Sequence, residues 1–143
     1  MGERLTVVLE DGVAEQLVQL AGSSRRQGEY LSGLLRGGGT ESATQLRVAM
    51  QKLMTDKVGI FRTGEELGKA VSELQVLLDR SQRIGLRNKA PGANPELATA
   101  YRVQKMLKVA LCMAHGASVR TESRGAHFRE DHPRRDDANC LKR

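Results

Sequence analysis

The stretch TGEELGKAVSELQVLLDRS, residues 63–81, decides the fold of this chain. Thr63 and Glu66 have the T-x-x-E spacing of a capping box, in which each side chain bonds the backbone N–H of the other at the start of a helix. Behind the box, apolar residues recur every three or four positions, at Leu67, Ala70, Val71, Leu74, Leu77 and Leu78. This period predicts an amphipathic helix whose apolar stripe must pack against other helices.

Two further segments carry helix signals of the same kind. Ser42 and Gln45 have the S-x-x-Q spacing before a helix with Leu46, Ala49, Met50, Leu53 and Met54 on one face. Asn94 can cap and Pro95 can open a long third helix, in which apolar residues occupy more than one face. We therefore predict a mainly α fold, a spectrin-like three-helix bundle with the third helix wedged at its centre, followed from Arg120 by a charged C-terminal tail without an apolar period.

The segment before the bundle has a different pattern. Residues 4–9, RLTVVL, alternate as a half-buried strand does, and two helices follow, the first with Val13, Leu17 and Leu20, the second capped by Ser23 or Ser24. Three consecutive glycines then interrupt the chain. We expect a strand-helix-helix unit over residues 1–36, a glycine hinge over 37–41 and a helical domain over 42–143.

Composition limits the classes of function. The 143 residues are 39% hydrophobic and 28% charged, which is typical of a globular domain with a modest core. No apolar run approaches the roughly 20 residues of a membrane span and no signal peptide is recognisable, so we expect a cytoplasmic protein without direct membrane insertion. The formal charge is +6, but residues 1–36 carry a balance of −1, so the basic excess lies after them.

The tail RTESRGAHFREDHPRRDD, residues 120–137, mixes histidines, acids and arginines. His127 and His132 are five apart, which does not place both on one face of a helix, and zinc ligands are normally two to four apart, so the spacing predicts no metal site. The arginines either clamp a dicarboxylate or pair with the acids of their own segment. Their even mixing favours internal pairing within a solvated or docking surface and weakens attraction to phosphate.

Longer stretches resemble a known family. LMTDKVGIFRTGEEL, NPELATAYRVQKMLKVALCMAHGA and RTESRGAHFREDHPRRDDAN are similar, in order and spacing, to the C-terminal helical region of the flavoprotein subunit of fumarate reductases and succinate dehydrogenases. The resemblance covers residues 40–143. It implies that the chain is a fragment or fusion of the flavoprotein subunit of an electron-transport oxidoreductase. Its partner would be the flavin domain or the iron–sulfur subunit. The complex would place the chain at the cytoplasmic face of the membrane.

The same resemblance implies what each residue does. The family's FAD-binding and substrate-binding residues lie upstream of this region, so no catalytic, cofactor-binding or metal-binding residue is expected in this chain, FAD belongs to the parent subunit, and activity of the chain alone is not expected. The tail would be a docking surface. Its docking and interface residues would be Arg120, Glu122, Ser123, Arg124, His127, Arg129, Asp131, Arg135, Asp136 and Asp137.

Residues 1–36 resemble a different family, the ribbon–helix–helix module. In that family two chains pair their strands and place outward residues in the DNA major groove. The resemblance implies an alternative function, a DNA-binding dimer of the transcriptional regulator or antitoxin type with an appended helical bundle. It would form a homodimer through the N-terminal strand and contact nucleic acid through Arg4, Thr6, Arg25 and Arg26.

Overall fold

A computed structural model describes residues 24–90 and 92–140 of the chain. Its elements are α2 (Ser24–Arg36), α3 (Ala43–Lys57), β1 (Phe61–Arg62), α4 (Gly64–Ser81), α5 (Pro95–Val119), β2 (Phe128–Arg129) and α6 (Asp137–Cys140). The strand predicted at residues 4–9 and the helix predicted after it lie outside the described residues. So do Arg4 and Thr6 and the side chains of Arg25 and Arg26, and the DNA contacts and strand pairing assigned to them stay predictions.

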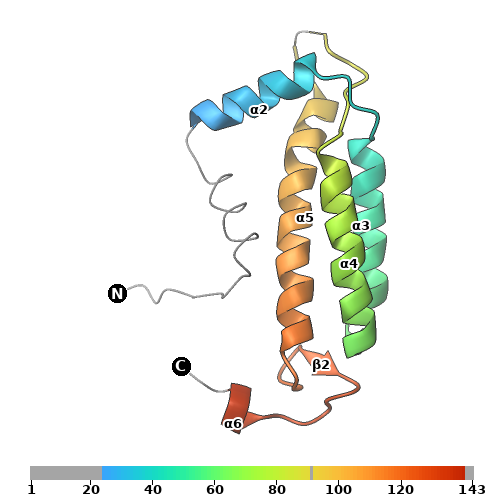
Figure 1. Ribbon diagram of the computed structural model, residues 1–143, viewed down its shortest axis with the longest axis vertical. Coiled ribbons are helices and arrows are strands. Elements are labelled where there is room, and N and C mark those ends of the chain that lie inside the picture. The colour runs from blue at the N-terminus through green and yellow to red at the C-terminus, as the bar shows by residue number, and fades with distance from the viewer. Residues whose placement is uncertain (1–23, 91, 141–143) are drawn as a thin grey trace.

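In the described part of the chain, the long helices α3, α4 and α5 lie side by side, and α2 crosses the end of α5 (Figure 1). Each long helix begins after the residue predicted to cap it, whose side-chain oxygen accepts a hydrogen bond from a backbone N–H three residues on. The donor–acceptor distances are 3.5 Å at Ser42, 3.2 Å at Thr63 and 3.0 Å at Asn94. The predicted three-helix bundle is confirmed.

The core lies where the apolar stripes of the three helices meet. The most deeply buried side chains come from all of them: Leu46 of α3, Leu67, Ala70 and Leu74 of α4, and Ala100, Val103 and Leu107 of α5. Burial of a leucine stabilises a fold by about 1.5–3 kcal/mol relative to leaving it exposed. The helices are therefore held together by the positions that the sequence period singled out.

Helix α5 is covered on only part of its surface by the described residues. Tyr30 of α2 lies on its first turns, with a ring-centroid distance of 6.2 Å to Tyr101, but Met106, Val109 and Met113 are exposed. Helix α5 therefore lies between α2, α3 and α4, as its predicted wedged position requires, while this apolar stripe stays exposed. Among the described helices, none combines the length and the apolar character that crossing a bilayer requires.

The glycine run crosses closely over the α4–α5 connection. The backbone N–H of Glu41 donates to the carbonyl of Arg83 at 3.0 Å, and the N–H of Gly85 donates to the carbonyl of Glu41 at 3.1 Å. A Cβ on Gly85 would lie 1.8 Å from the carbonyl oxygen of Gly39, and one on Gly39 would lie 2.4 Å from that of Ile84. Close approach of two backbones, rather than flexibility, therefore requires these glycines. The domain boundary predicted there stays a prediction.

The chain after the glycine run contains two short strands, β1 and β2, although no strand was predicted there. β1 and β2 pair in parallel, with Phe61 opposite Phe128 and Arg62 opposite Arg129. The N–H of Glu130 donates to the carbonyl of Arg62 at 2.8 Å. Because a strand of two residues shows no alternating pattern, the sequence did not predict β1 and β2. They attach the tail to the connection between α3 and α4.

Candidate docking site

Glu122 is an ionisable residue with no exposed surface. Its Oε1 accepts hydrogen bonds from Arg120 Nη2 at 2.7 Å and Arg124 Nε at 2.9 Å, and its Oε2 accepts from Arg124 Nη2 and the N–H of Asp136, both at 2.9 Å. A buried carboxylate is tolerated only with such partners. The bonds from Arg124, then those from the N–H of Asp136 and from Arg120, lower the pKa of Glu122 to about 2 against the opposing effect of burial. Glu122 thus joins Arg120, Arg124 and the backbone of Asp136 in one hydrogen-bonded group.

Arg129 is also buried, with 2% of its surface exposed, and it caps α5. Its Nη1 donates to the carbonyl oxygens of Ala117 at 3.2 Å, Ser118 at 3.1 Å and Arg120 at 3.3 Å. The last carbonyls of a helix have no partner within the helix and carry the negative end of its dipole. Since α5 has no basic residue in its own last turn, the tail supplies the cation.

Arg129 also forms a bidentate ion pair with Asp131, with both N···O distances at 2.7 Å. Asp131 Oδ2 in turn accepts the N–H of Gly64, the first residue of α4, at 2.8 Å. A carboxylate is stabilised at this positive end of a helix. Hydrogen bonds from Arg129 first, and then from the N–H of Gly64, lower the pKa of Asp131, while burial opposes them. One ion pair therefore connects the end of α5 to the start of α4.

Ser123 and His127 connect further parts of the tail. Ser123 Oγ accepts the N–H of Arg129 at 2.8 Å. His127 Nδ1 lies 2.8 Å from Arg62 Nη1, and its Nε2 lies 3.2 Å from the carbonyl oxygen of Arg120. Because a guanidinium only donates, Nδ1 accepts and Nε2 carries the proton, which is the neutral tautomer. The ring thus bridges β1 and the residue that follows α5.

The last described turn, α6, is fixed by carboxylates. Asp136 Oδ1 accepts the N–H of Asn139 at 3.0 Å, as the cap of a helix does. Asp137 Oδ1 accepts from Arg124 Nη2 and from Arg135 Nε, both at 2.6 Å. Arg124 consequently bridges two carboxylates, and the hydrogen bonds that it donates, to Glu122 first and to Asp137 second, raise its pKa.

The structure brings all the predicted docking residues together. We call tail network the hydrogen-bonded set of Arg120, Glu122, Ser123, Arg124, His127, Arg129, Asp131, Arg135, Asp136 and Asp137 with Arg62 and Gly64. The internal pairing favoured by the sequence is what the geometry shows, while docking by these residues stays a prediction. Sequence reasoning missed Arg62 and Gly64, and the break in helical period around residues 57–64 is the signal that could have pointed to them.

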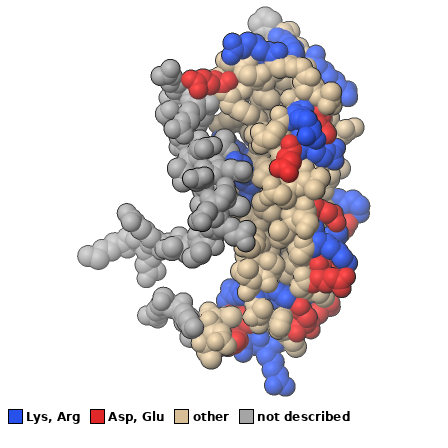
Figure 2. All heavy atoms as spheres, in the orientation of Figure 1, with Lys and Arg blue, Asp and Glu red and all other residues tan. Residues whose placement is uncertain are grey.

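The network leaves its surface mixed in charge. Basic and acidic side chains are interleaved at the end of the molecule that carries the tail, the lower end in Figure 2. Arg124 and Arg129, which could have clamped an external dicarboxylate, are bonded to carboxylates of their own segment. Among residues 24–90 and 92–140, no three His, Cys, Asp or Glu side chains are grouped so that they could hold a metal ion.

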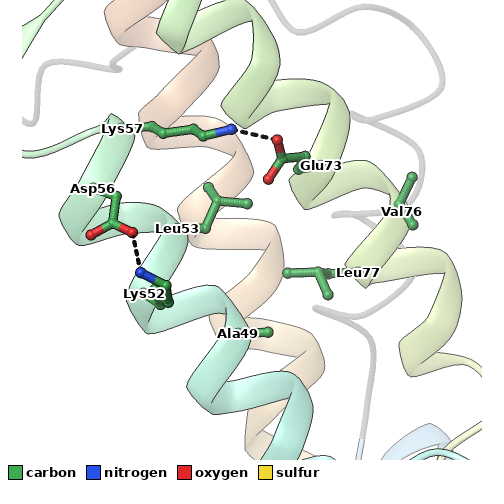
Figure 3. Close-up of a pocket in the computed structure, with 8 residues that line it drawn as sticks. All are labelled: Ala49, Lys52, Leu53, Asp56, Lys57, Glu73, Val76 and Leu77. Carbon is green, nitrogen blue, oxygen red and sulfur yellow. Dashed lines mark hydrogen bonds and ion pairs between the residues drawn. The ribbon is translucent and has the colours of Figure 1, made fainter.

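A concave groove lies between α3 and α4. This groove has a volume of about 480 Å³ and apolar walls. Leu53 and Leu77 point into it from facing helices (Figure 3). The ion pairs Lys52–Asp56 and Lys57–Glu73 stand at its rim. Its mixed rim gives no preference for a ligand of either sign.

Acid should loosen the tail network. Because the folded-state pKa values of Glu122 and Asp131 are lowered, both carboxylates stabilise the fold above their ordinary pKa values, and this contribution is lost as the pH falls through the folded values. We expect the free energy of unfolding, measured with urea, to fall between about pH 5 and about pH 2. The fall should be shallower in Glu122→Gln, and an identical pH profile for this variant would contradict the assignment.

Comparison with protein families places most of the chain in one group. A family model described as "Fumarate reductase flavoprotein C-term" matches residues 47–143. The chain is 50% identical over 115 residues to a fumarate reductase flavoprotein subunit of Helicobacter pylori, covering 80% of this chain and 16% of that protein. It is 34% identical over 143 residues to the corresponding subunit of a Serratia species, covering 99% of this chain and 24% of that protein.

Solved structures agree with the sequence relatives. An E. coli quinol fumarate reductase matches with a TM-score of 0.75 at 36% identity, covering 87% of this chain and 21% of that chain. A Mycobacterium smegmatis Sdh1 complex matches with a TM-score of 0.69 at 32% identity, covering 79% and 20%. The chain thus spans about a fifth of the length of these relatives. Since the Serratia alignment includes the N-terminal segment, the comparisons give no support to the DNA-binding alternative.

Proposed function

Because this chain belongs to the family of the C-terminal helical region of fumarate reductase and succinate dehydrogenase flavoproteins, we propose that it acts as a docking domain for the flavin-bearing part of a fumarate–succinate oxidoreductase. The bundle is the rigid support in this proposal, and the tail network shapes the surface that meets the partner. The iron–sulfur subunit of such a complex is the alternative partner in this proposal. The complex would place the chain at the cytoplasmic face of a membrane.

The observation that carries this proposal is the internal satisfaction of the tail. Glu122 and Arg129 are buried, and their hydrogen bonds end on carboxylates, carbonyls and guanidinium groups of the same region. A segment rich in charge that is fixed in this way presents one defined shape, and preorganised surfaces lose less entropy when they bind. Surface ion pairs that only served solubility would not require burial.

FAD belongs, in this proposal, to the parent subunit rather than to this region. A pyrophosphate is held by free backbone N–H groups at a helix start or by free arginines. Here the N–H of Gly64 at the start of α4 is bonded to Asp131, and Arg129 is bonded to the same carboxylate. Gly64 and Arg129 are therefore not free to hold a pyrophosphate.

A chimera tests the proposal. The H. pylori flavoprotein subunit, with its matching region replaced by this chain, should purify with bound flavin and reduce fumarate when supplied with an artificial electron donor. Its relationship of 50% identity makes the exchange feasible. The control is the same subunit with the region deleted, which should lose flavin. A chimera without flavin, or a deletion that keeps full activity, would contradict the docking role.

A further inference from the structure

An aromatic patch projects from the end of the bundle that carries the tail. It consists of Ile60, Phe61 and Phe128, which are 73%, 69% and 36% exposed. Phe61 and Phe128 lie opposite each other in the β1–β2 pair, and their rings meet edge to face with centroids 6.2 Å apart. Single exposed apolar residues are ordinary, but a contiguous aromatic pair beside an isoleucine has the character of a binding surface.

The backbone under this patch is fixed by the tail network. Phe61 is followed by Arg62, whose Nε donates to the carbonyl of Gly59 at 2.7 Å and whose Nη1 bonds His127. Phe128 is followed by Arg129, the buried cap of α5. The backbone that carries both rings is consequently fixed before any partner arrives. Buried aromatic anchors surrounded by polar groups are the residues that contribute most to interfaces.

The size of the patch decides between two occupants. A stable complex between separate chains buries about 800 Å² on each side, which takes roughly 20–30 residues. Three side chains fall well short of that, so a second copy of this chain held by the patch alone would dissociate. A partner that is tethered needs less contact, because its effective concentration reaches the millimolar range. In the relatives, about four fifths of the subunit lies outside the matched region and shares its polypeptide.

We infer that the aromatic patch is the contact by which this region seats in an apolar recess of the flavin-bearing remainder of its parent subunit. The inference rests on the proposed function and names the surface within it. Ile60 and Phe61 enter the recess from the connection between α3 and α4, and Phe128 supports them from the tail. The charged residues of the tail network surround the contact and set its orientation.

The test uses the chimera and the isolated chain side by side. The double variant Ile60→Ser, Phe61→Ser should lower the temperature at which the chimera releases flavin by about 5 °C, because the contacts of two side chains with the recess are lost. This shift must exceed any fall in the unfolding midpoint of the isolated chain, because losing the contact between the two rings destabilises the chimera and the isolated chain alike. Ile60→Ser alone, which has no ring partner, should lower the release temperature of the chimera and leave the isolated chain unchanged.

The matched control is Val109→Ser, Met113→Ser on α5, whose residues are 59% and 57% exposed. This control should not lower the flavin-release temperature of the chimera by more than it lowers the unfolding midpoint of the isolated chain. This inference would be overturned if the patch variant lowered the flavin-release temperature of the chimera and the unfolding midpoint of the isolated chain equally. It would also be overturned if the control lowered the release temperature as far as the patch variant does. Either result would leave the docking role intact. A wild-type chimera that holds no flavin would overturn the docking role and this inference with it.

Discussion

Arg129→Ala should destabilise the protein by about 3 kcal/mol, since loss of one partner of a buried ion pair typically costs 3–5 kcal/mol and Asp131 is partly hydrated. The variant leaves the terminal carbonyls of α5 without their cation and leaves Asp131 at the start of α4 without its bidentate partner. Urea unfolding measures the loss. Limited proteolysis should in addition show earlier cleavage within residues 120–140, because the tail loses its attachment to the bundle.

Two control variants separate this effect from a simple change of charge. Arg135→Ala removes an exposed arginine of the same tail, and it should change the unfolding free energy by less than about 0.5 kcal/mol. Arg129→Lys keeps the charge but loses the planar fork, so we expect it to recover only part of the stability. If Arg129→Ala cost no more than Arg135→Ala, the terminal carbonyls of α5 would have other partners and the capping role would be wrong.

Gly85→Ala is the second substitution with a large expected effect. The added Cβ would lie 1.8 Å from the carbonyl oxygen of Gly39, and neither backbone can turn away as a side chain could. The hydrogen bonds that join Glu41 to Arg83 and Gly85 would have to break to make room. Overpacking generally costs 1–3 kcal/mol, and a backbone clash belongs at the upper end, so we expect a loss of about 3 kcal/mol in urea unfolding.

Gly68→Ala is the matched control for this glycine substitution. Gly68 lies within α4, and a Cβ there meets nothing within 4 Å. The change should stabilise the protein by about 0.5–1 kcal/mol, because alanine loses less conformational freedom in a helix than glycine does. A Gly85→Ala variant as stable as the parent chain would mean that the two segments do not cross as described.

The sequence was sufficient to predict where the three long helices begin and which face of each is buried. The boxes at Ser42 and Thr63 and the Asn94–Pro95 start predicted where the long helices begin, and each cap bond is present. The apolar period predicted which residues, such as Leu67 and Leu74, reach the core. These signals are readable because a helix brings residues three and four apart onto one face, so spacing alone determines what is buried together.

The sequence also identified the tail residues but not what they do. Its evenly mixed charges predicted internal pairing, and Arg124 and Arg129 do pair with acids of their own segment. The order of the residues could not show that Arg129 caps α5 or that Asp131 reaches Gly64. Those bonds join residues separated by up to 67 positions, and no local period records such a distance.

What the sequence by itself determined, then, is the set of helices and the face that each one buries. The tertiary structure alone decided how their ends are satisfied: a cation and an anion two residues apart in the tail serve the negative end of α5 and the positive end of α4 at once. It also decided that the backbone of Gly39 passes close to Gly85. The reason is that orphan carbonyls and N–H groups exist at every helix end, and only the packing of the helices fixes which distant side chain can reach them.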